Sequence, residues 1–117
     1  MMDVVVFSPP VGGEIRTSRI EVIQQHVARA FGLRVEELNQ RSTTRAVTLP
    51  RQVAIYLAKQ LTDASLVEIG NHFGGKHHST VMYSIAKIHQ LRRTDPAVDL
   101  AINTLLKALD QGEGPVT

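Results

Sequence analysis

Hydrophobic residues recur every three or four positions along most of this chain, the spacing that places them on one face of a helix. Short polar or glycine-containing stretches interrupt the pattern, so several helices are expected rather than one long one. The expected helices span residues 18–31, 35–38, 49–61, 65–73, 79–91 and 96–109. No convincing strand pairing is found, and the pattern predicts an all-α helical bundle without internal repeats.

Local signals mark where three of these helices begin. Ser18 with Glu21 and Ser65 with Glu68 form capping boxes, in which each side chain can bond a backbone N–H that has no helical partner. The last helix is expected to begin at the Asp-Pro pair of residues 95–96, because aspartate is a good cap and proline fits the first helical position.

A polar loop, residues 39–48, is expected between the second and third helices. It carries Arg41 and Arg45. The third helix is expected to begin at residues 48–49, with Pro50 in its first turn, where a missing N–H costs no helical hydrogen bond.

The length of 117 residues predicts one domain. Residues 1–15, with two prolines and two glycines, are expected to form a mobile arm, residues 16–111 the domain, and residues 112–117 a flexible tail. The chain has no cysteine, which excludes disulfides and thiolate metal sites. The apolar run near the N-terminus, residues 4–7, is too short for a signal peptide or a membrane span, so a cytoplasmic protein without membrane association is expected.

Positive charge is concentrated in the middle of the chain. Residues 38–94 carry a net charge of +6, whereas the rest carries −4. This distribution favours a polyanionic partner such as nucleic acid, although a solvated basic surface would have the same charge.

The segment from residue 65 to residue 91 has the pattern of a helix-turn-helix: a short helix, a turn containing Gly74 and Gly75, and a longer helix. In such motifs the start of the second helix meets base edges and phosphates in the major groove of DNA. The candidate contact residues at this start are Lys76, His77, His78, Ser79 and Thr80. Their ammonium, imidazole and hydroxyl groups suit phosphate and base contacts, and double-stranded DNA is therefore the expected partner.

The same residues carry a family resemblance. "SLVEIGNHFGGKHHSTVMYSIAKI", residues 65–88, resembles the signature of the C-terminal DNA-binding domain of DnaA, the bacterial replication initiator, and "LPRQVAIYLAKQLT", residues 49–62, resembles the helix before it. The similarity extends from about residue 18 to about residue 109. It implies a Trp-repressor-like helical fold with a basic loop before the third helix, and a nucleoid-associated protein that regulates replication initiation or transcription.

The resemblance also implies DNA contacts at particular positions. Arg51 and Gln52 match the family's phosphate-gripping pair, and Lys76 matches its basic phosphate contact. The family's base-contacting histidine and its hydroxyl pair fall on His78, Ser79 and Thr80. Arg41 and Arg45 lie in the loop that reaches the minor groove in this family.

Two positions depart from the family pattern. His77 stands where an aspartate usually accepts from a base amino group, and an imidazole can instead donate to guanine or thymine. Thr43 stands where the minor-groove arginine is expected. The chain also has no P-loop, so we expect no nucleotide, no cofactor and no ATP-driven assembly.

Other classes of function have weaker support. The three histidines between residues 72 and 78 lack metal-ligand spacing, and the serines lack the strand-to-helix turn of a nucleophile, so neither a metal site nor catalysis is predicted. The remaining alternative is a protein-interaction module that kept the fold and lost specific DNA binding. The pattern does not predict an oligomeric state.

Overall fold

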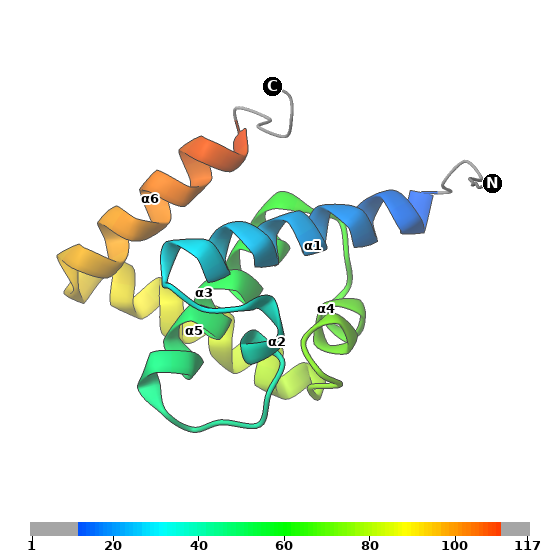
Figure 1. Cartoon of the computed structure of the whole chain (residues 1–117), viewed down its shortest axis with the longest axis horizontal. Coiled ribbons are helices and arrows are strands. Elements are labelled where there is room, and N and C mark those ends of the chain that lie inside the picture. Colours follow the sequence, from blue (N-terminus) through cyan, green and yellow to red (C-terminus); the bar gives the residue numbers. More distant parts are fainter. Residues whose placement is uncertain (1–11, 111–117) are drawn as a thin grey trace.

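The computed structural model describes residues 12–110, and the side chains from Arg19 onward. Within this range every regular element is a helix (Figure 1). The helices are α1 (Gly12–Ala30), α2 (Val35–Leu38), α3 (Arg45–Leu61), α4 (Leu66–His72), α5 (His78–Thr94) and α6 (Pro96–Asp110). The predicted all-α fold with a helix-turn-helix is confirmed.

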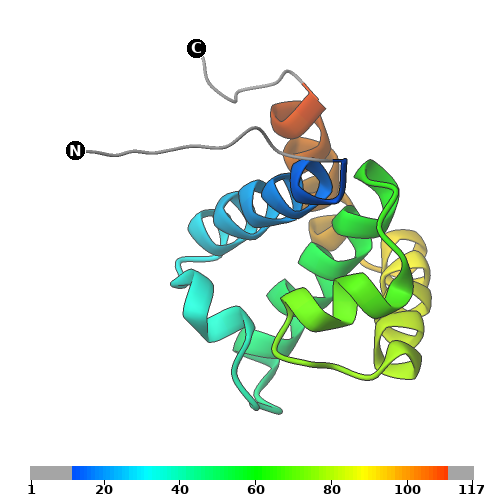
Figure 2. The same ribbon diagram turned by 90° about the vertical axis from the view of Figure 1, so that its right-hand side faces the viewer.

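Helix α3 forms the centre of the bundle. Its neighbours are α1, α2, α4 and α5, while α6 packs against α5 and α1 (Figures 1 and 2). Because helices surround it, α3 buries more than the single stripe that the sequence pattern predicts. Ile55 and Tyr56 are buried together with Val53 and Leu57, at 3% exposure or less.

Helix α1 begins at Gly12 and not at Ser18. Ser18 therefore lies inside the helix, and the capping box predicted there is wrong. Residues 12–15, assigned to a mobile arm, are helical, while residues 1–11 and the expected tail at 112–117 lie outside the described residues. Glycine in a helix costs only about 1 kcal/mol relative to alanine, so the glycine pair at residues 12–13 can be part of the first turn of α1.

The loop before α3 is also shorter than predicted. Helix α3 begins at Arg45, where the carbonyl oxygen of Thr44 accepts from the N–H groups of Val47 and Thr48. Arg45 thus belongs to the first turn of the helix, and Pro50 lies in the helix interior. The loop itself is residues 39–44, which we call the basic loop.

The other predicted helix starts are close to those observed. Ser65 Oγ accepts from the Glu68 N–H at 3.1 Å while Glu68 Oε1 accepts from the Ser65 N–H at 2.8 Å, so the second capping box is confirmed. Asp95 Oδ1 accepts from the N–H groups of Ala97 and Val98, which confirms the cap of α6.

Arg92 of α5 fixes α6 to the rest of the bundle. Its Nε donates to Asp99 Oδ1 at 2.7 Å, one Nη donates to the Tyr56 hydroxyl at 3.1 Å, and the other donates to Asn103 Oδ1. The hydrogen bond to Asp99 raises the pKa of Arg92 above its usual value. One guanidinium therefore links α5, α3 and α6.

Arg92→Met should loosen α6. We expect the free energy of unfolding to fall by about 1–2 kcal/mol, because the lost hydrogen bonds are partly solvent-exposed. Urea unfolding followed by circular dichroism measures this change. The control is Arg93→Met at the exposed neighbouring position, for which a change within about 0.5 kcal/mol is expected. Equal losses in the two variants would contradict a structural role for Arg92.

Candidate nucleic-acid interface

The turn between α4 and α5 positions the start of α5. Gly74 and Gly75 have φ angles of +83° and +76°, a conformation that glycine adopts without steric cost. The N–H of Lys76 donates back to the carbonyl oxygen of Gly70 at 2.9 Å. The backbones also approach closely, since a Cβ on Gly70 would lie 2.2 Å from the carbonyl oxygen of Lys76. The geometry of the helix-turn-helix therefore depends on Gly70, a residue that the sequence analysis did not single out.

Helix α5 begins one residue earlier than predicted, at His78, with His77 as its N-cap. His77 Nδ1 accepts from the N–H of Ser79 at 3.1 Å and lies 2.8 Å from Ser79 Oγ. The rings of His77 and His78 lie beside each other, with centroids 4.3 Å apart and planes tilted by 34°. These three residues and Thr80 are exposed, so the first turn of α5 presents polar groups to solvent.

The basic loop and the helix-turn-helix turn lie on the same side of the molecule, the lower side in both views (Figures 1 and 2). Between them is a cleft with a volume of about 480 Å³, which we call the basic cleft. Its lining residues are Arg41, Ser42, Thr43, Arg51, Gly74, Gly75, Lys76 and His77. Burial, together with the charges of Arg51 and Arg41, lowers the pKa of Lys76. The guanidinium groups of Arg51 and Arg41 lie near the ammonium group of Lys76, so the cleft carries positive charge that suits an anion.

The family resemblance implied a phosphate contact for Arg51, but the structure buries this residue on α3. It is only 8% exposed. Its Nε donates to the carbonyl oxygen of Leu38 at 2.9 Å, and its two Nη atoms donate to the carbonyl oxygens of Ser42, at 3.3 Å, and Gln40. Burial lowers the pKa of Arg51. Its guanidinium thus holds the basic loop against α3.

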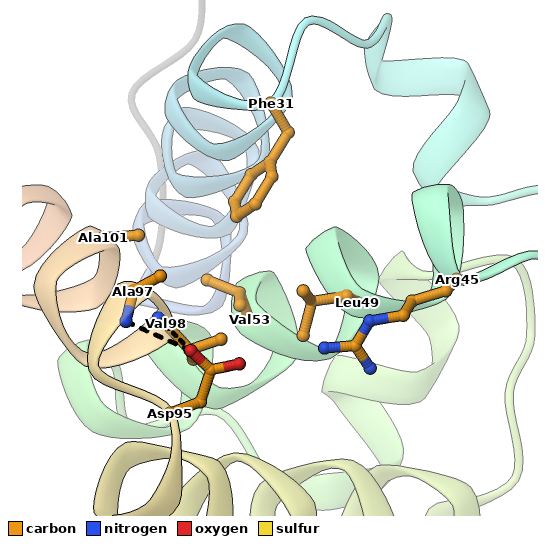
Figure 3. A pocket seen from close by; sticks show the side chains of 8 residues that line it. All are labelled: Phe31, Arg45, Leu49, Val53, Asp95, Ala97, Val98 and Ala101. Carbon is orange, nitrogen blue, oxygen red and sulfur yellow. Dashed lines mark hydrogen bonds between the residues drawn. The ribbon is translucent and has the colours of Figure 1, made fainter.

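Arg45 does not join the basic cleft. It lies at a separate, mainly apolar pocket of about 200 Å³ formed by α1, α3 and the start of α6 (Figure 3). Phe31, Leu49, Val53 and Asp95 are among the residues that line this pocket. The structure therefore brings Arg41 near Lys76 and His77 but separates Arg45 from them. Gln52 is half-buried next to Arg51 on α3.

Two further residues of α5 share the exposed surface of its first turn. Met82 and Tyr83 are 52% and 60% exposed. They follow His78 and Ser79 by four residues and so extend the same face of the helix by one turn. The sequence contains a signal for them, because neither belongs to the inward-facing series Val81, Ile85 and Ile88, but the sequence analysis did not use it.

Two observations concern other kinds of site. Among the side chains of residues 19–110, no three from His, Asp or Glu gather in a way that could hold a metal ion. None of the described helices is both long enough and apolar enough to span a membrane.

The fold and the site define this chain as a helix-turn-helix protein. A short capped helix, a glycine turn and a second helix with an exposed polar start are the parts of a helix-turn-helix, here placed beside a basic cleft.

Comparison with known proteins identifies the family. The sequence model of the family "bacterial DnaA protein helix-turn-helix" matches residues 20–88, more than half of the chain. The chain therefore belongs to this family. The chromosomal replication initiator protein DnaA of Levilactobacillus brevis is 43% identical over 86 residues, which cover 74% of this chain and 19% of that protein. The protein of the same name from Thermus thermophilus is 43% identical over 103 residues, covering 88% of this chain and 23% of that protein. The chain thus spans about a fifth of the length of these relatives.

Proposed function

We propose that this chain binds double-stranded DNA sequence-specifically, with the start of α5 in the major groove and the basic loop at the minor groove. The observation that carries the proposal is the position of the exposed first turn of α5 at the edge of the basic cleft. A helix start that offers N–H, imidazole and hydroxyl groups can contact bases, while the neighbouring cations neutralise phosphates. Membership in the helix-turn-helix family supports the same proposal.

The proposed contacts divide by chemistry. Lys76 and Gln52 contact the DNA backbone, and Arg41 on the basic loop reaches the minor groove. The proposed base-contacting residues are His77, His78, Ser79 and Thr80. Arg45 lies outside the basic cleft. We propose that it contacts DNA beside the surface formed by the cleft and the start of α5. For Arg51 the hydrogen bonds to three carbonyl oxygens favour an indirect role, in which it holds the loop that carries Arg41.

The relatives suggest where such binding is used. Both are chromosomal replication initiator proteins, which supports a role in replication initiation. Control of transcription by the same DNA-binding surface is the alternative use that we propose. Because the family match covers a helix-turn-helix, we propose that these residues contribute DNA recognition and not ATP hydrolysis.

Selection of bound duplexes from a random library at low salt tests the proposal. We expect enrichment of a defined sequence, with an affinity that falls steeply as salt rises, because bound phosphates release their counterions. If no sequence is enriched, specific DNA binding is wrong and a protein-interaction module is the better interpretation.

Lys76→Gln should weaken binding to all duplexes by a similar factor. The reason is that Lys76 is proposed to contact a phosphate, which is common to all sequences. We expect the slope of log affinity against log salt to decrease in magnitude by roughly one. Fluorescence anisotropy titrations at several salt concentrations measure both effects, with Lys107→Gln on α6 as the control. A loss confined to one sequence would contradict a phosphate contact.

A further inference from the structure

We propose that the cap of α5 fixes the hydrogen-bonding polarity of the DNA-reading surface, with His77 as a donor and Ser79 as an acceptor. This inference rests on the proposed DNA binding and adds what the surface selects. At the base that faces His77, a donor favours guanine or thymine, which present acceptors there, over cytosine, which presents only an amino group in the major groove.

The first step concerns the two nitrogens of the His77 ring. The N–H of Ser79 lies 3.1 Å from His77 Nδ1. A backbone N–H can only donate, so Nδ1 must be the unprotonated, accepting nitrogen. In a neutral imidazole the proton is then on Nε2, which becomes a donor. The capping bond therefore selects one of the two neutral forms of the ring.

The second step concerns the hydroxyl of Ser79. Ser79 Oγ lies 2.8 Å from the same Nδ1. Since Nδ1 carries a lone pair and no proton, the hydroxyl must be the donor in this contact. Its proton is then directed at the His77 ring, and the oxygen offers only lone pairs to DNA. Ser79 can accept from a base amino group while this contact is kept.

The third step concerns the orientation of the ring. The two contacts with Ser79 hold the Nδ1 edge of the His77 ring against the first turn of α5. The His78 ring lies beside it at 4.3 Å between centroids. His77 is exposed and lines the basic cleft, so the Nε2 edge is on the accessible side of the cap. The donor is thus positioned before DNA arrives.

Two substitutions of His77 separate its role as the helix cap from its role as a hydrogen-bond donor toward DNA. Asparagine and aspartate both cap helices well, because each can accept the Ser79 N–H with a side-chain oxygen. In His77→Asn, the amide nitrogen remains available as an outward donor. In His77→Asp, the second carboxylate oxygen can only accept. Both variants therefore preserve the cap, but only His77→Asp reverses the polarity that faces DNA.

The experiment is a competition among duplexes that differ only at the base pair facing His77, within the sequence selected by the unmodified protein. We expect the unmodified protein and His77→Asn to share one preference. We expect His77→Asp to favour a base with an exposed amino group, with a relative preference shifted by roughly fivefold to thirtyfold. Identical preferences for the two variants would overturn the inference while leaving DNA binding intact.

A measurement without DNA completes the test. Two-dimensional ¹H–¹⁵N spectra that correlate the ring nitrogens with ring protons distinguish the two neutral forms of His77 at a pH at which the imidazole is neutral. We expect an unprotonated Nδ1 and a protonated Nε2. A proton on Nδ1 would overturn the inference even if the chain binds DNA. In contrast, the expected spectrum together with no enriched duplex would overturn the proposed function.

Discussion

Replacing Arg51 with methionine should lower the free energy of unfolding by about 2–4 kcal/mol, because it removes charged hydrogen bonds to three backbone carbonyl groups in a buried setting. The carbonyl oxygens of Leu38, Gln40 and Ser42 would lose their donors, and the basic loop would lose its attachment to α3. Urea unfolding measures the change. Arg41→Met, an exposed substitution on the same loop, is the control and should stay within about 0.5 kcal/mol of the unmodified protein.

Arg51→Lys distinguishes holding the loop from gripping a phosphate. Lysine keeps the charge but has no planar fork that can donate to three acceptors in different directions. If Arg51 acts through the loop, this variant should lose stability, exchange the amide hydrogens of residues 40–44 faster without DNA, and bind DNA more weakly. Near-normal stability and affinity would instead mean that a positive charge at this position is sufficient, which would contradict the indirect role.

Replacing Gly70 with alanine should have an equally large effect, a loss of about 3 kcal/mol or more. The added Cβ would lie 2.2 Å from the carbonyl oxygen of Lys76. That neighbour is backbone, so no side-chain rotation relieves the clash. The turn must move, and α4 and α5 must change their relative position. Thermal unfolding measures the loss, and amide chemical shifts of residues 76–80 report the movement of the DNA-reading turn.

Gly75→Ala is the matched control for this substitution. A Cβ on Gly75 meets nothing within 4 Å, so only its φ of +76° opposes a side chain. A non-glycine residue in this left-handed conformation costs about 1–2 kcal/mol. Equal stability of the two variants would mean that the close approach at Gly70 does not limit the structure.

The helix starts show which features of the fold could be predicted from the sequence and which could not. The capping box of Ser65 and Glu68 and the cap at Asp95 were predicted correctly, because the partners in each are at most three residues apart. The starts of α1 and α3 were placed too late. Glycine costs a helix about 1 kcal/mol and proline about 3 kcal/mol, and packing against neighbouring helices can outweigh both costs.

The all-α fold, the family and the identity of the polar residues after the glycine turn could be predicted from the amino-acid sequence. These features depend on spacing, local caps and motifs of neighbouring residues. The roles of residues whose partners are distant in the sequence became clear from the three-dimensional arrangement alone. Arg51 is buried because the loop folds back over it, and Arg45 lies apart from Lys76 because α3 begins earlier than expected. The accepting nitrogen of His77 likewise became apparent only from its three-dimensional contact with the first turn of α5. A one-dimensional pattern specifies which groups are present, but their hydrogen-bond partners depend on the direction in which the folded backbone points them.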